Sequence, residues 1–241
     1  MFKNQLDLLR QQIPIGIHHA INLLDKTNGD IAQAKSLFEE EIVNIIINKT
    51  SVLPEVAKRH LIKNGYDISK TLISIDEERF TLTELILHKT KNNKEDGLYK
   101  IAYAIEEREN LKRNFWLSFE SLGNLNAYQY CIVTICEWLE YEDYENFSSA
   151  LYFYVDIVTN EIEIKLSLPQ VANYIRRAKQ RREEILALYK EKQQDKNFIL
   201  VGEFVERDKE YRKNEDAFHK ERTLIIDRLH DLVMKNVSRF P

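Results

Sequence analysis

Five carboxylates stand close together in an aromatic segment and form the densest set of side chains that could transfer protons or hold a metal ion. They are Glu137, Glu140, Glu142, Asp143 and Glu145, beside Trp138 and Tyr141. Paired carboxylates can act as acid and base or bind a divalent cation. The solvated end of a helix would show the same residues, and the aromatic neighbours would also suit contact with a basic partner surface. We favour these non-catalytic interpretations.

A dense run of cations follows later in the chain. It consists of Arg176, Arg177, Lys179, Arg181 and Arg182. Such a run can follow the phosphates of RNA or DNA. Acidic residues come directly after it, however, and a formal net charge of −4 is not typical of a nucleic-acid-binding protein. We interpret the run as a helix face paired with acidic helices, and ribosome or RNA association through it is the alternative function.

The sequence lacks the other patterns that carry chemistry. No two glycines form GxG, no HExxH or HxH occurs, and the adjacent His18 and His19 would point about 100° apart on a helix. Cys131 and Cys136 lack the spacing of a metal site, and we interpret them as buried thiols in a reducing compartment. We therefore expect a protein that is not an enzyme, with no catalytic residue, cofactor or metal.

The composition indicates which elements carry these residues. Only six glycines and four prolines occur in 241 residues, and because these residues mark turns, their scarcity favours long helices. The apolar runs fall far short of the ~20 residues that cross a bilayer. The first ten residues also lack the continuous apolar stretch of a secretion signal. We expect a cytoplasmic protein without membrane contact.

An internal repeat occupies the N-terminal third of the chain. Ile13–Phe38 and Thr50–Ile75 superpose with a shift of 37 positions. The shift aligns Ala20 with Ala57, Leu24 with Leu61, and Asp30 with Asp67. Each copy predicts a short helix, a turn containing glycine and a second amphipathic helix. The aligned aspartates stand where a side chain caps the second helix of each copy.

The first copy carries a pattern that resembles a known family. The pattern consists of Ala20, Leu24, Asn28, Gly29, Asp30 and Ala34. It resembles the ubiquitin-associated (UBA-like) fold, and it is most similar to the N-terminal module of elongation factor Ts and the C-terminal module of the nascent-polypeptide-associated complex. Gln12-Ile13-Pro14 replaces the usual Thr-Gly before the loop, and Leu53-Pro54 stands where the first copy has Gly16-Ile17. The resemblance covers residues 5–76 and implies two three-helix binding modules, with a possible link to translation.

The resemblance also implies a binding surface. In this family the surface is the loop between the first two helices together with the end of the third. Position by position, it implicates Ile15, Gly16, Ile17, Leu37 and Phe38 in the first copy, and Val52, Leu53 and Ile75 in the second. Core packing is the alternative role for Ile17, Leu37 and Ile75. The segment that joins the copies is apolar, so we expect the two modules to pack together.

The remainder of the chain predicts a second domain. The polar run Lys89–Asp96 is the expected linker, which places tandem modules at 1–90 (repeats at about 5–48 and 49–88), a linker at 91–96 and a domain at 97–241. Period-two alternation across 152–158 and 162–166 predicts a β-hairpin, and 198–204 is a candidate third strand. Long helices are expected from Pro169 to about Gln193 and over 208–236. The predicted fold is mainly α: tandem three-helix UBA-like modules followed by an α+β domain.

The last predicted helix carries an apolar stripe with a spacing of seven residues. Its members are Tyr211, Phe218, Ile225 and Leu232. The stripe suits helix packing, with the core as the favoured location and a second chain as the alternative.

The predicted function is protein–protein interaction as an adaptor or regulatory protein. The leading contact is the Ile15-Gly16-Ile17 loop of the first copy. The partner is expected to be another protein, either in the translation machinery or with a ubiquitin-type fold. The sequence leaves its identity and the oligomeric state of the chain open.

Overall fold

The computed structural model describes residues 2–190 and 198–241, which divide into two compact units, Met1–Thr81 and Leu82–Pro241. The division lies ahead of the predicted linker at 91–96. The polar run Lys89–Asp96 instead spans the end of one helix, a short turn and the start of the next helix, all inside the second unit. The Asn93 side chain accepts a 3.1 Å hydrogen bond from the backbone N–H of Asp96. The polar residues of this run therefore cap a helix and do not separate two domains.

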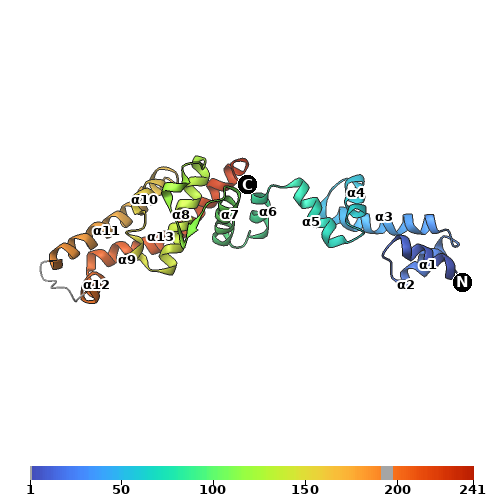
Figure 1. The fold of residues 1–241 in the computed structure, drawn as a ribbon, viewed down its shortest axis with the longest axis horizontal. Helices are drawn as coiled ribbons and strands as arrows, with labels where there is room; N and C mark the ends of the chain where they lie inside the picture. The colour runs from blue at the N-terminus through green and yellow to red at the C-terminus, as the bar shows by residue number, and fades with distance from the viewer. Residues whose placement is uncertain (1, 191–197) are drawn as a thin grey trace. The chain divides into compact units, whose positions relative to one another are not determined.

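The first unit is built from helices alone in its described part. They are α1 (Lys3–Gln12), α2 (Ile17–Lys26), α3 (Ile31–Thr50), α4 (Pro54–Lys63) and α5 (Ile68–Arg79). Helix α3 packs against α1 and α2 and also against α4 and α5 (Figure 1). When the sequence is shifted by 37 residues, α1 aligns with residues 40–49 of α3 and α2 aligns with α4. The start of α3 then aligns with α5. Helix α3 therefore completes the first copy of the repeat and begins the second.

The two copies repeat each other in backbone geometry. After α2, Asn28 and Gly29 both have positive φ, and after α4 the aligned Gly65 and Tyr66 do the same. The Gly29 N–H donates to the carbonyl of Leu24 at 2.8 Å, which is the hydrogen bond that closes a helix at its C-terminus. The aligned Tyr66 N–H donates to Leu61 at 2.9 Å. The two turns therefore have the same geometry at the shift of 37 positions.

One apolar core runs through both copies. Its fully buried members include Leu9 and Ala20 of the first copy and, at the aligned positions, Ile46 and Ala57 of the second. The expectation that the two modules pack together is therefore confirmed. One aligned pair differs in chemistry, because buried His60 stands where the first copy has Leu23. Its ring nitrogens lie 2.8 Å from the Ser74 hydroxyl and 2.9 Å from a Glu78 carboxylate oxygen, so the polar ring has partners in the second copy.

The second unit is also dominated by helices. They are α6 (Leu82–Lys89), α7 (Lys94–Arg108), α8 (Ala127–Tyr144), α9 (Phe147–Ala150), α10 (Val155–Ile164), α11 (Pro169–Lys190), α12 (Phe198–Arg207) and α13 (Lys209–Lys235), with short 3-10 turns at Phe119–Leu122 and Val237–Arg239. Helix α8 lies at the centre, since its residues 131–139 are all buried and it packs against α7, α9, α10 and α13. Helices α11 and α13 pack along each other (Figure 1). The polypeptide end returns to the start of the unit, where the Thr83 N–H donates to the Pro241 carbonyl at 2.9 Å.

The predicted β-hairpin is wrong, and so is the α+β class of the second domain. Residues 155–164 form helix α10, and the candidate strand at 198–204 lies in helix α12. Val155, Val158 and Ile162 are buried at spacings of three and four, so the segment also carries a helical period that packs on α8 and α11. The strands in the described residues are the two-residue segments β1 (Arg113–Asn114) and β2 (Trp116–Leu117), which lie elsewhere in the chain.

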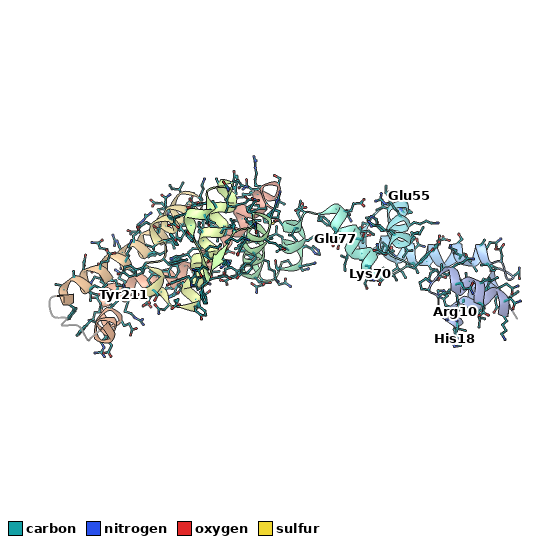
Figure 2. The ribbon with its side chains drawn as sticks, in the orientation of Figure 1. Arg10, His18, Glu55, Lys70, Glu77 and Tyr211 are labelled. Atoms are coloured by element: carbon teal, nitrogen blue, oxygen red, sulfur yellow. The ribbon has the colours of Figure 1, made fainter. Side chains whose placement is uncertain are left out.

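Other expectations for the second unit are confirmed. Tyr211, Phe218 and Ile225 are buried in the core, so the stripe on α13 packs inside the unit, and Figure 2 labels Tyr211 on this helix. Cys131 and Cys136 are free, buried thiols. The predicted end of the long helix near Gln193 falls outside the described residues. Across the part of the chain that the structure describes, no helix combines the length and the apolar character needed to cross a membrane.

Candidate functional site

The loops that enter α2 and α4 hold the exposed part of the predicted binding surface. Gly16 caps α2 with φ −66° and ψ 147°, and the aligned Leu53 caps α4 with φ −66° and ψ 148°. This extended backbone turns the chain into each helix, and one apolar side chain at each helix entry stays outside the core. Ile17 is 50% exposed and Leu53 is 69% exposed. These positions of the predicted surface are open to a partner.

The other predicted residues contribute mainly to the core. Ile15, Phe38 and Ile75 are buried, while Leu37 and Val52 are half-buried and pack against the same apolar cluster. Ile15 lies only two residues before Ile17, but its backbone N–H bonds the Ile13 carbonyl at 2.9 Å, in a bend of the loop. The predicted surface therefore separates into exposed helix-entry residues and buried residues that support them.

A further exposed residue extends this surface along α2. Ile21 is 39% exposed and lies four positions after Ile17, on the same side of the helix. The buried residues Ala20, Leu23 and Leu24 form the adjoining arc of the helix, so the two isoleucines lie at the edge of the buried face. We call Ile17 and Ile21 the α2 stripe. His18, which follows Ile17, is also exposed (Figure 2). The i, i+4 spacing of two isoleucines outside the buried arc was the sequence signal for this stripe.

The second copy does not reproduce the α2 stripe. Pro54 stands at the position of Ile17, and Lys58 stands at the position of Ile21. The Lys58 ammonium lies 2.9 Å from a carboxylate oxygen of Glu39, which is itself buried. The copies therefore differ at these two positions. The first copy has two exposed isoleucines there, whereas the second has a proline and an ion-paired lysine and exposes other apolar side chains, Leu53, Ile62 and Ile73.

The basic run on α11 is largely paired within the second unit. Arg176 donates to Glu163 at 2.5 Å and Lys179 to Asp156 at 3.0 Å. Arg181 makes two hydrogen bonds to Asp208, at 3.0 and 2.7 Å, and both side chains are partly buried. These three cations are therefore already paired with carboxylates of the same unit. The contacts agree with the interpretation of the run as a charged helix face that pairs with acidic residues of other elements.

The two remaining cations of this run have different surroundings. Arg182 donates to the Ser148 hydroxyl at 2.7 Å, and its guanidinium lies 4.4 Å from the centre of the Tyr152 ring. Arg177 is exposed and has no polar partner among the described residues. One cation without a partner is a weak basis for tracking a phosphate backbone, whose binding depends on many such charges.

The acidic cluster of α8 divides among separate partners. Glu137 is buried and bonds Arg113, Glu140 accepts a hydrogen bond from the hydroxyl of Tyr103, and Asp143 lies 2.5 Å from Arg222. Glu142 is also buried. The interpretation as a solvated helix end is therefore wrong for Glu137 and Glu142, which face the interior of the unit.

Glu142 is the member of this cluster with the most perturbed chemistry. Burial raises the pKa of its carboxyl to about 7, and the neighbouring Asp143 adds to the increase while Arg222 opposes it. The Arg222 Nε atom lies 3.7 Å from the carboxylate, too far for a hydrogen bond, and it is buried without any other partner. The other guanidinium nitrogens bond Glu95 at 2.6 Å and Asp143. The described residues contain no group of three His, Cys, Asp or Glu side chains placed to hold a metal ion.

Comparison with known proteins places the second unit in a family. Residues 81–238 match the family model of the YfbN C-terminal domain. The chain is also 35% identical over 182 residues to the protein YfbN of Escherichia coli (strain K12), itself uncharacterized, and the match covers 76% of each chain. No solved structure matches the chain. The family match covers almost all of the second unit and leaves the repeat of the first unit outside it.

Proposed function

The chain belongs to the YfbN family, and we propose that it is a protein-interaction protein whose first unit binds a partner protein through the α2 stripe. The observation that carries the proposal is the pair of exposed isoleucines, Ile17 and Ile21, on one side of α2. Both side chains leave a large part of their apolar surface in water, where it does not stabilise the unit. An apolar partner surface would remove them from water.

The contrast between the copies supports this use of the stripe. A helical repeat that served stability alone would favour polar residues on its exposed side in both copies. At the position of Ile21 the second copy has Lys58, so the α2 stripe belongs to the first copy alone, although Leu53, Ile62 and Ile73 of the second copy are exposed elsewhere. Two further exposed apolar residues, Leu8 (48%) and Ile45 (44%), occupy aligned positions of the repeat and widen the apolar surface of the unit.

The binding free energy that the α2 stripe can supply depends on the apolar area that is still exposed. A fully buried isoleucine contributes about 1.5–3 kcal/mol, so each half-exposed member of the stripe has about 1 kcal/mol left to contribute on binding. Such contacts are insensitive to salt, since no charge is neutralised. The resemblance of the first copy to the elongation factor Ts module supports a partner in the translation machinery.

The proposal is tested by affinity capture with the full chain from native lysate, at low and high salt. Ile17→Asp and Ile21→Asp place a charge on the stripe, and Asn22→Asp places the same charge at an exposed polar position of the same helix. We expect one protein partner that is retained at high salt, lost with the first two variants and kept with the control. Circular dichroism checks that all variants keep their helix content. Equal capture by all four proteins would contradict the proposal.

A further inference from the structure

A tight turn in the second unit presents an aromatic side chain to solvent. Strands β1 and β2 pair antiparallel, with Arg113 opposite Leu117 and Asn114 opposite Trp116. Phe115 is the single residue between them, and its φ of +64° is one that bulky side chains rarely adopt. Its side chain is 92% exposed, the highest value among the exposed large hydrophobic residues of the described chain. Phe115 therefore adds almost nothing to the core and occupies a strained conformation.

Contacts beneath the turn impose this conformation. The backbone N–H of Leu117 donates a 2.7 Å hydrogen bond to Oε1 of Glu137, a buried carboxylate on α8. Arg113 bonds the same carboxylate at 2.9 Å and Glu106 of α7 at 2.7 Å. The turn is thus tied to two helices through both of its strands. A residue held in an unfavourable φ by surrounding structure is a common feature of binding sites.

Aromatic rings surround the base of the turn. The centre of the Trp116 ring lies 4.9 Å from that of Tyr141 and 5.9 Å from that of Tyr144. Tyr144 is itself 78% exposed. We call Phe115, Trp116, Tyr141 and Tyr144 the aromatic platform. Tyr141 and Tyr144 follow Glu137 and Glu140 by four residues each, so these four residues lie on one face of α8. The platform therefore lies next to Glu137, which supports the turn.

The border of the platform is acidic. Glu140 and Glu145 lie on or directly after α8, and Glu145 is exposed without a polar partner in the described part of the chain. On the other side, Glu106 and Glu107 line a shallow pocket of about 360 Å³ together with Tyr103 and Arg113. The Arg113 charge is already shared between Glu106 and Glu137. Arg108 and Lys112 are also exposed in this region, but they are outnumbered by the exposed Glu107, Glu109 and Glu145 together with the half-buried Glu140. The net charge that a partner meets is therefore negative.

Aromatic faces and carboxylates both attract cations. The negative face of an aromatic ring binds an ammonium or guanidinium group, and a nearby carboxylate adds direct charge pairing. The pocket already contains one example, since the Arg113 guanidinium lies 5.5 Å from the centre of the Tyr103 ring. Phosphate groups of nucleic acids or anionic lipids would be repelled by the same border. We propose that the aromatic platform binds an arginine- and lysine-bearing segment of a partner protein.

This surface is independent of the α2 stripe, because it lies in the other unit and recognises charge. The chain has an internal probe for it: Trp116 belongs to the platform, whereas Trp138, its second tryptophan, is fully buried. Titration of the full chain with a hexa-arginine peptide is expected to change tryptophan fluorescence to saturation, with an affinity that falls as salt rises. A hexaglutamate peptide is expected to cause no change.

Phe115→Gly separates binding from folding. Glycine adopts a positive φ without strain, so the variant is expected to unfold at the same or a higher temperature than the wild type, yet to bind hexa-arginine at least about fivefold more weakly. Tyr144→Ser, which leaves the turn intact, is expected to weaken binding as well. Phe80→Ser, at an exposed aromatic residue of the first unit, is the control and is expected to bind normally.

Three results would overturn the proposal. One is equal affinity of hexa-arginine for the wild type, Phe115→Gly and Tyr144→Ser. Another is a fluorescence change with hexaglutamate or a single-stranded oligonucleotide as large as that with hexa-arginine. The third is a change on adding phosphatidylcholine vesicles that Phe115→Gly abolishes while hexa-arginine has no effect, which would make the platform a membrane contact.

Discussion

Asp30 and Asp67 hold the same position in the two copies of the repeat and make the same hydrogen bond. Each side chain accepts a 3.0 Å hydrogen bond from the backbone N–H three residues further along its helix. The two N-cap residues also share nearly the same backbone conformation, with φ −73° and −77°. The repeat is therefore preserved in its local chemistry as well as in its order of helices.

Loss of either capping side chain is expected to lower the free energy of unfolding of the first unit by the same amount. Asp30→Ala and Asp67→Ala should each lower the free energy of unfolding of the first unit by about 1 kcal/mol, because each leaves one helix without its capping acceptor. The double variant should lose the sum, since the caps lie on different helices. Denaturation followed by circular dichroism measures the loss. Tryptophan fluorescence should not change, because both tryptophans lie in the second unit.

Asp25→Ala is the matched control for the caps. This exposed residue lies in the same unit, and its side chain makes no hydrogen bond within the described chain. Its substitution should leave stability within about 0.5 kcal/mol of the wild type. A cost for Asp25→Ala equal to that of the cap variants would contradict the assigned role of the two aspartates.

A substitution at Gly97 is expected to reverse the usual effect of alanine in a helix. Alanine normally stabilises a helix interior by about 1 kcal/mol over glycine. At Gly97, however, a Cβ atom would lie 2.4 Å from Oγ1 of Thr90, whose hydroxyl donates a 2.7 Å hydrogen bond to the Ile86 carbonyl. Gly97→Ala should therefore destabilise the second unit by about 1–3 kcal/mol in urea denaturation followed by tryptophan fluorescence.

A double-mutant cycle identifies the cause of that loss. Thr90→Ala removes the hydroxyl that obstructs the new methyl group, so the two substitutions together should cost less than the sum of their separate effects. Strictly additive costs would show that the collision with Thr90 is not the reason for the destabilisation.

Glu142 is expected to make stability depend on pH near neutrality. Burial raises the pKa of its carboxyl from 4.5 to about 7, whereas the unfolded chain ionises this group near 4.5. The unfolded state loses the proton first as pH rises, so the contribution of Glu142 to stability falls between pH 4.5 and 7 and stays low above it. Glu142→Gln should gain about 1–2 kcal/mol relative to the wild type between pH 4.5 and pH 8.

Urea denaturation at several pH values, followed by tryptophan fluorescence, measures this difference. His219 lies 3.9 Å from the Glu142 carboxylate and Asp143 is adjacent to it. His219 and Asp143 are present in both the wild type and Glu142→Gln, so the difference between the two proteins reports on Glu142 alone. A difference in unfolding free energy that stays constant over this pH range would contradict the assignment.

The repeat was predictable because its signals are local. A glycine that closes one helix and an aspartate that caps the next act within a few residues, and both occur twice at one spacing. The helix α10 was not predictable in this way. Its valines and isoleucines favour strands and alternate with polar residues, yet the same residues also fit a helical period. Packing on α8 and α11 selected the helix.

Exposure of the residues in the predicted site could not be read from the sequence. Ile15 and Ile17 have the same side chain and lie two residues apart, but a bend in the loop buries the first and exposes the second. The positive φ of Phe115 could not be predicted from the sequence, because phenylalanine does not favour this conformation. It follows from contacts to Glu137 and Glu106, which lie more than six residues away in sequence.

The most direct test of the proposed function is photo-crosslinking of the full chain in cells. A benzophenone amino acid replaces Ile17, Ile21 or Leu53 in separate proteins, and Asn22 in a control, which lies about 140° around α2 from Ile17. We expect one crosslinked partner protein shared by positions 17 and 21, and its absence at position 22. The same partner captured equally at position 22, or no partner at 17 and 21, would contradict an interaction through the α2 stripe.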